Sequence, residues 1–272
     1  MDSFILVFLV TLGALLLGVG VLHLIPFMGR PGRRLAQALC RAPLLDVPVT
    51  YFTAAPLIVG LLVAGWVGLA AGIAAQVVGT VTWCFLHELA HPRARRGPRI
   101  VKVLNKRVGR FRNHAALWVT TVAVPAFWVV RVIEVVFYPL LVVLVRFPRY
   151  RHGDWVNCSR QKFDGLVGHD LIWCLYCDWM TGVWVLGTDM LRNVESFWCP
   201  IRFDSEKKCE NCRQDFPDLD GGWIAADGSM AEVAALLERK YPGDGKVYAW
   251  FGHPARLTIE GRTPGDSEDE LE

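Results

Sequence analysis

The sequence has 272 residues, of which 53% are hydrophobic, and its formal net charge is +3 at pH 7. The mean hydropathy of +0.31 is high for a soluble protein, and the length allows one large domain or two modest ones. The apolar residues gather before Arg146, whereas the rest has the composition of a soluble protein with an acidic end. This division argues against a wholly soluble protein and favours a membrane domain followed by a soluble part.

The first apolar run covers residues 4–25 and contains no charged side chain. A helix of that length crosses the roughly 30 Å hydrocarbon layer of a bilayer. A signal peptide is the alternative, but no basic segment precedes the run, and Pro26 follows it in place of a small-residue cleavage site. We therefore expect a retained membrane anchor.

The second apolar run covers residues 47–86 without a formal charge. A single straight helix of that length would be roughly 60 Å long, about twice the hydrocarbon thickness. The run is therefore expected to fold back on itself. Residues 65–72 carry three glycines, which permit a tight reversal of the backbone, and are the expected turn.

The third apolar run covers residues 115–145, and only Arg131 and Glu134 interrupt it. These two side chains are three residues apart, so they share one face of a helix and can pair. The run is either a hairpin with the charges at its turn or one long tilted helix.

Basic loops flank the second run on both sides, and basic residues also follow the third. Short basic loops stay in the cytoplasm, so the pattern predicts about five crossings, an external N-terminus and a cytoplasmic C-terminal half. The loop at residues 93–112 has no acid and few aromatic residues, which favours contact with anionic lipid headgroups and not with nucleic acid. The basic residues are Arg30, Arg33, Arg34, Arg41, Arg93, Arg95, Arg96, Arg99, Lys102, Lys106, Arg107, Arg110, Arg112, Arg146, Arg149, Arg151, Arg160 and Lys162.

A long amphipathic helix is predicted at residues 168–196, because its apolar residues recur at spacings of three and four. It contains the first of two Cys-x-x-Cys pairs, Cys174 and Cys177. Cys199 follows the helix, and the second pair, Cys209 and Cys212, lies in a polar stretch beyond it. Two such pairs brought together by the fold can complete a tetrahedral sulfur site.

The identity of the metal stays open. Stable disulfides are not expected in the cytoplasm, so clustered thiolates there are typical of metal ligands. Zinc suits a four-cysteine site, and an iron–sulfur cluster uses the same ligands. Cys158 and His169 are possible additional ligands, whereas Cys40 and Cys84 fit small buried apolar residues.

A second metal motif is His87-Glu-Leu-Ala-His91, which fits H-E-x-x-H. It resembles the motif of membrane-associated zinc metallopeptidases. That resemblance implies His87 and His91 as zinc ligands and Glu88 as the general base. The segment at residues 218–222 is also similar to the third-ligand segment of intramembrane peptidases. Pro92 departs from the pattern because it disfavours helical geometry at His91, and from the sequence we expect Glu88→Gln to be nearly silent.

A small α/β unit is predicted after residue 222. Residues 223–226 read as a strand, Ser229 and Glu232 form a capping box for a helix ending near Lys240, and residues 246–251 and 256–260 read as strands. The acidic tail from residue 264 is expected to be disordered. None of this unit carries a phosphate loop or a dinucleotide fingerprint.

The predicted fold is mainly α. A polytopic helical membrane domain at 1–148 precedes a cysteine-rich metal-binding region at 149–222, a small α/β unit at 223–262 and an acidic tail at 263–272. We expect an integral protein of the inner or plasma membrane that contacts lipid and a protein partner. Its expected role is a structural or electron-transfer subunit of a membrane complex with zinc or an iron–sulfur cluster. The alternative is a membrane-embedded zinc metallopeptidase.

Overall fold

The computed structural model describes residues 2–145, 147, 149–205, 207–208 and 223–240. These residues are mostly helical and form no sheet, only the isolated bridges Arg41↔Asn157 and Ile201↔Ile224. They divide into two compact units. The first consists of Met1–Pro125 and His152–Gly182, and the second of the described residues of Ala126–Arg151 and Val183–Glu272.

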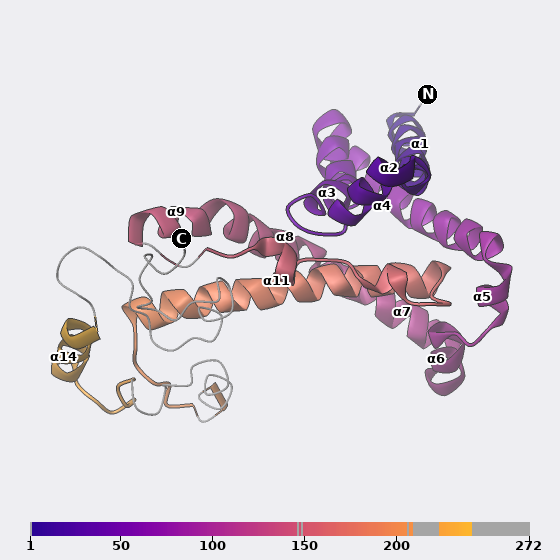
Figure 1. Cartoon of the computed structure of the whole chain (residues 1–272). Coiled ribbons are helices and arrows are strands. Elements are labelled where there is room, and N and C mark those ends of the chain that lie inside the picture. Colours follow the sequence, from indigo (N-terminus) through magenta and orange to yellow (C-terminus); the bar gives the residue numbers. More distant parts are fainter. Residues whose placement is uncertain (1, 146, 148, 206, 209–222, 241–272) are drawn as a thin grey trace. The chain divides into compact units, whose positions relative to one another are not determined.

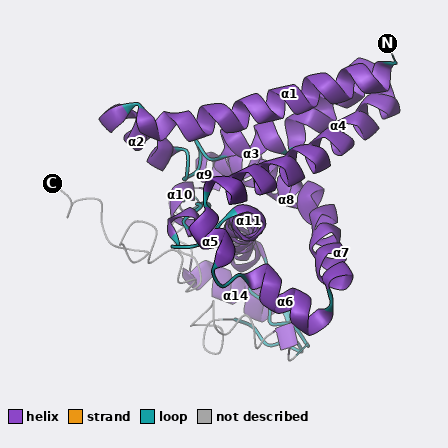
Figure 2. Ribbon diagram, turned by 90° about the vertical axis from the view of Figure 1, so that its right-hand side faces the viewer, coloured by secondary structure: helices purple, strands orange, loops and turns teal. Residues whose placement is uncertain are grey.

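The first unit is built around two long apolar helices. Helix α1 (Ser3–Leu24) lies alongside α4 (Ala54–Ala90), with α3 (Asp46–Phe52) joining them (Figures 1 and 2). Gln76 of α4 donates its side-chain amide to the carbonyls of Phe52 and Thr53, at 2.8 and 2.7 Å, and so ties α4 to the α3–α4 junction. The remaining elements are α2 (Gly29–Ala38), α5 (Pro92–Arg96), α6 (Ile100–Val108), α7 (Arg110–Thr120), α10 (His152–Trp155), the 3-10 turns Ile25–Phe27, Thr121–Ala123 and Arg160–Lys162, and the first half of α11 (Gly168–Trp198).

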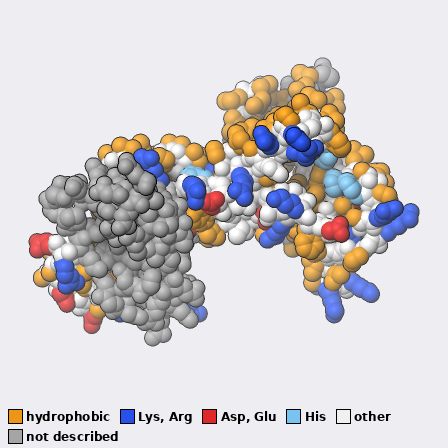
Figure 3. Space-filling model, in the orientation of Figure 1, with side chains coloured by type: hydrophobic (Ala, Val, Ile, Leu, Met, Phe, Trp, Pro, Cys, Tyr) orange, Lys and Arg blue, Asp and Glu red, His pale blue; other side chains and the backbone are white. Residues whose placement is uncertain are grey.

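Three helical stretches are long and apolar enough to cross a membrane: Ser3–Phe27, Ala54–Ala90 and Arg110–Val145. They overlap the three apolar runs of the sequence, at 4–25, 47–86 and 115–145. Large apolar side chains on them face outward, as at Leu62, which is 79% exposed. Figure 3 shows hydrophobic side chains covering the part of the first unit that holds α1 and α3, with basic side chains beside it at α2. The surface is compatible with insertion into a bilayer.

Helix α4 reverses direction, as its length predicted. Ala64 and Gly65 leave helical geometry, and Gly65 has φ +59°. A Cβ on Gly72 would lie 2.7 Å from the carbonyl oxygen of Pro56, and one on Gly68 would overlap the carbonyl of Gly60. Residues this far apart along one continuous helix cannot touch, so the two arms run back along each other. The turn lies at the first glycine of the predicted segment.

Adding a methyl group at this crossing tests the hairpin. Gly68→Ala is expected to lower the free energy of unfolding by about 1–3 kcal/mol, because the new Cβ meets the backbone of the opposite arm, which cannot move independently. The matched control is Gly13→Ala in α1, where nothing lies within 4 Å of the new Cβ. Thermal unfolding in detergent should separate the two variants, and equal unfolding temperatures would contradict the packed hairpin.

The second unit contains most of α8 (Val124–Val132), a π-helical segment (Ile133–Phe137), α9 (Tyr138–Val145), the second half of α11 and α14 (Met230–Lys240). The predicted pair of Arg131 and Glu134 is confirmed, with 2.6 Å between Nη1 and Oε2 and both residues about 1% exposed. Asn193 of α11 donates its amide to the hydroxyls of Tyr138 and Tyr150.

The predicted capping box of α14 is also confirmed. The backbone N–H and hydroxyl of Ser229 each donate to Glu232 Oε2 at 2.7 Å, and the N–H of Glu232 donates to Ser229 Oγ at 3.4 Å. In place of the strand predicted at residues 223–226, the structure has the single bridge to Ile224. The strands predicted at 246–251 and 256–260 and the acidic tail lie outside the described residues.

Candidate functional site

Cys174 and Cys177 lie on α11, which spans Gly168–Trp198 and so extends two residues beyond the predicted helix. Their spacing of three residues places both thiols on one side of the helix. Both cysteines are free and half-buried. The structure therefore brings the first Cys-x-x-Cys pair together within the first unit.

Arg160 places its guanidinium beside this pair. Its positive charge lies close enough to Cys174 and Cys177 to act on both thiols, and its Nε lies 2.8 Å from Asp178 Oδ1. The other oxygen of Asp178 accepts the N–H groups of Ser159 and Arg160, at 2.9 and 3.0 Å. Burial raises the pKa of Cys174, and Arg160 acts in the opposite direction because a cation favours the thiolate. Asp178 thus fixes a positive charge next to the two sulfur atoms.

The other predicted cysteine ligands are not positioned relative to this pair. Cys199 is exposed, follows the end of α11 and belongs to the second unit. Cys209 and Cys212 lie outside the described residues. Within the described residues, no three His, Cys, Asp or Glu side chains are grouped to hold a metal. The four-cysteine site stays a prediction.

Cys158, a possible additional ligand, makes hydrogen bonds to the backbone of Cys40 and Leu175. Its N–H donates to the Cys40 carbonyl at 2.9 Å, and its thiol donates to the carbonyl of Leu175 at 3.8 Å. Burial raises the pKa of Cys158 to about 12.

The H-E-x-x-H histidines lie at the end of α4. The ring centroids of His87 and His91 are 4.4 Å apart, and His91 has left helical geometry, with φ −120° and ψ 65°. The N–H of Gly168 donates to His87 Nδ1 at 3.1 Å, and His91 Nδ1 lies 2.9 Å from the His87 carbonyl. The pair is positioned by contacts within the protein, and no third ligand joins it among the residues that the structure describes.

Glu88 has partners of its own. Its Oε1 accepts hydrogen bonds from Arg99 Nη2 at 2.9 Å and from the N–H of His169 at 3.3 Å. The second bond satisfies a backbone donor in the first turn of α11 and places a negative charge near the positive end of that helix. In this geometry Glu88 links the end of α4 to Arg99 and to the first turn of α11.

Arg99 is the centre of this arrangement. Arg99 is 5% exposed. Its Nε donates to Asp170 Oδ2 at 2.7 Å, and its Nη2 also donates to the Val167 carbonyl at 3.2 Å. Asp170 Oδ1 in turn accepts the N–H of Val101 at 3.0 Å. We refer to Glu88, Arg99 and Asp170 as the Arg99 network. It ties three separate segments of the first unit to one buried guanidinium.

Gly168 allows α11 to begin against this network. Its φ is +51°, and a Cβ there would lie 2.6 Å from Glu88 Oε1 and 2.8 Å from the Cys84 carbonyl. Both the backbone conformation and the space require glycine.

The network predicts a pH dependence of stability. Burial alone would raise the pKa of Asp170, but the neighbouring His169 ring and the hydrogen bonds from Arg99 and the Val101 N–H outweigh it and hold that pKa below its usual value. A depressed carboxylate pKa stabilises the fold fully above the unfolded-state pKa of about 3.9, and this contribution is lost as the pH falls through the folded-state pKa. The stability difference between the wild type and Asp170→Asn, measured by chemical unfolding, should therefore shrink as the pH is lowered below about 3.9. A difference independent of pH would contradict the ionic role of Asp170.

The sequence did not single out Arg99, Asp170 or Arg160 as site residues. Arg99 and Arg160 stood among many basic residues, and nothing in their local spacing distinguishes a buried guanidinium from an exposed one. Asp170 carried a weak local signal, because an acidic residue in the first turn of a helix suits the helix dipole.

The chain matches no known family model, no curated protein and no solved structure.

Proposed function

We propose that this chain is an integral membrane protein with a cysteine-ligated metal in its cytoplasmic half. It acts as a structural or electron-transfer subunit of a membrane complex. The ligands are Cys174, Cys177, Cys209 and Cys212, with Cys199 nearby or replacing one of them. The observation that supports the proposal best is the free Cys174–Cys177 pair on one side of α11, with a fixed Arg160 beside it.

The chemistry of this pair suits a metal–thiolate centre. A divalent ion bound by four thiolates carries a net charge of about −2, which a neighbouring cation stabilises. Hydrogen bonds to the ligating sulfurs also tune such centres, and in an iron–sulfur cluster they raise the reduction potential. Arg160 supplies the cation, because its positive charge acts on both thiols, and its guanidinium offers N–H donors to the sulfurs once they are thiolates.

The membrane topology is part of the same proposal. The reversal in α4 lets the second apolar run enter and leave on one side, as the basic loops on both of its flanks require. With one pass for α1, two passes for the second run and two for the third run, the chain crosses about five times. The cysteine-rich half is then cytoplasmic, and the helix α14 with the strands predicted after it forms a small α/β unit.

Metal analysis of the purified full chain tests the proposal. We expect one metal site per chain, lost in both Cys174→Ser/Cys177→Ser and Cys209→Ser/Cys212→Ser, because each pair supplies half of the ligands. Cys84→Ser, which removes a half-buried thiol of α4, is the control and should retain the metal. Elemental analysis identifies zinc or iron, and sulfide with visible absorption identifies a cluster. Unchanged metal content in either double variant would contradict the four-cysteine site.

A further inference from the structure

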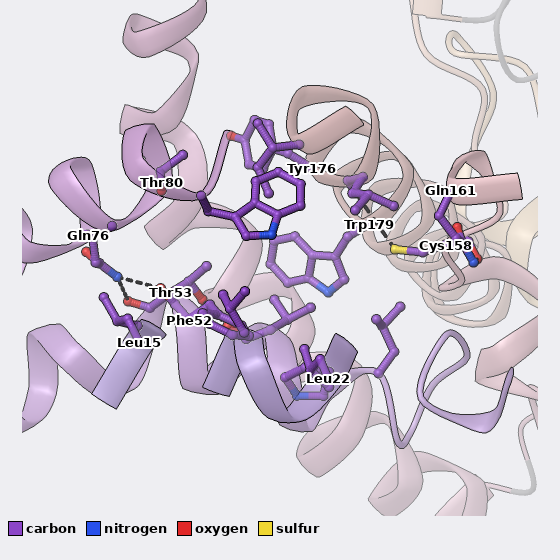
Figure 4. A pocket seen from close by; sticks show the side chains of 18 of the residues that line it. Leu15, Leu22, Phe52, Thr53, Gln76, Thr80, Cys158, Gln161, Tyr176 and Trp179 are labelled. Carbon is purple, nitrogen blue, oxygen red and sulfur yellow. Dashed lines mark hydrogen bonds between the residues drawn. The ribbon is translucent and has the colours of Figure 1, made fainter. Parts of the chain in front are cut away.

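A cavity of about 380 Å³ lies inside the first unit. Its walls come from α1, α3, α4 and α11, together with Cys40 and the segment containing Cys158 and Gln161 (Figure 4). Small-molecule sites in proteins typically have volumes of about 300–1,000 Å³. Two of its walls, α1 and α4, are candidate membrane helices, so the ligands expected beside them are those that partition into lipid.

The walls of the cavity are apolar and partly aromatic. Figure 4 shows Trp179 and Tyr176 from α11 on one side and Phe52 and Leu15 toward the other. No Lys, Arg, Asp or Glu is among the described residues that line it. A carboxylate or phosphate would lose its hydration here and meet no Lys or Arg among these lining residues, so the lining disfavours an anionic ligand.

One end of the cavity carries a specific polar group. The side-chain amide of Gln161 donates from Nε2 to the Cys158 carbonyl at 2.9 Å and to Cys40 Sγ at 3.1 Å. The Cys158 carbonyl can only accept a hydrogen bond, so the nitrogen of the Gln161 amide, and not its oxygen, faces it. Gln161 Oε1 is then buried without a hydrogen-bond partner among the described residues. A buried acceptor of this kind calls for a donor, and a ligand in the cavity that Gln161 lines can supply one.

We propose that this cavity binds a neutral lipid-soluble molecule with one apolar ring or chain and an uncharged hydroxyl group. The hydroxyl donates to Gln161 Oε1, and the apolar part lies against the aromatic and aliphatic walls. Ligands that offer only acceptors at that end, such as an ether or an oxidised quinone, leave Gln161 unsatisfied. The same chemistry is offered by a hydroquinone lipid and by a monoacylglycerol. The inference does not depend on the metal site.

Binding of four probes to the delipidated full chain in neutral detergent tests this site. The probes are decylhydroquinone under anaerobic conditions, its dimethyl ether, monolaurin, and dodecanoate at pH 8, each titrated by native mass spectrometry. We expect one molecule of a hydroxyl probe per chain, the ether to bind roughly three- to tenfold more weakly, and dodecanoate to show no stoichiometric binding. Tighter binding of decylhydroquinone assigns the site to a ring-headed lipid, and tighter binding of monolaurin assigns it to an acyl chain.

Three variants locate the binding. Thr80→Phe fills the cavity, whereas Val81→Phe adds the same ring one residue away on a 56% exposed position of α4. Only the first should abolish binding. Gln161→Leu should remove the preference for the hydroquinone over its ether, and this comparison does not require Thr80→Phe to fold. Equal binding of the hydroquinone and its ether by the wild type, or equal binding by the two phenylalanine variants, would overturn the proposal.

Discussion

Arg99→Met is expected to lower the free energy of unfolding by about 3–5 kcal/mol, because removing one member of a buried ion pair leaves the others without compensation. The guanidinium is the only partner charge in contact with Asp170 Oδ2 in the described residues, and the side chain of Asp170 is 4% exposed. Methionine keeps most of the aliphatic volume, so the loss reports the charge and its hydrogen bonds more than a cavity. Unfolding in detergent by heat or denaturant measures it.

The matched control is Arg96→Met, three residues away in the same basic loop. Arg96 is exposed, and its replacement should change the free energy of unfolding by less than about 0.5 kcal/mol. Asp170→Asn in an Arg99→Met background should cost less than in the wild type, since both changes remove the same interaction. Similar effects of Arg99→Met and Arg96→Met would show that Arg99 has no structural role.

The elements that the sequence predicted well are those encoded by neighbouring residues. The apolar runs predicted the three long helical stretches, and the excessive length of the second run predicted its reversal. The spacing of Ser229 and Glu232 predicted the start of α14. The Arg131–Glu134 pair was predictable for the same reason, because three residues on a helix determine which side chains can meet.

The Arg99 network could not be predicted in this way. Arg99 and Asp170 are 71 positions apart, and Glu88 and His169 are 81 apart. Helical spacing says nothing about contacts over such separations, which depend on how α11 packs against the end of α4. The same limit applies to the cavity, because Gln161 and Cys40 are 121 positions apart. The same limit applies to the two Cys-x-x-Cys pairs, because spacing identifies each pair but does not determine whether the fold brings the two pairs together.

Glu88→Gln is expected to lower the free energy of unfolding by about 1.5–3 kcal/mol, the usual contribution of a hydrogen bond to a charged group. From the sequence, this change is expected to be nearly silent for function. The contacts of Glu88 add an expectation for stability, because glutamine keeps the shape but removes the charge opposite Arg99 and at the first turn of α11. Thermal unfolding of the two proteins in the same detergent measures the difference.

A double-mutant cycle separates this role from catalysis by the H-E-x-x-H motif. If Glu88 stabilises the fold through its ion pair with Arg99, then Glu88→Gln should lower the free energy of unfolding much less in an Arg99→Met background, since the partner charge is already gone. If Glu88 is instead the general base of a zinc peptidase, Glu88→Gln should leave stability and bound zinc unchanged while a peptide-cleaving activity disappears, and His87→Ala should release the zinc. Undiminished stability of Glu88→Gln, together with zinc that depends on His87, would replace the structural role of this carboxylate with the hydrolase.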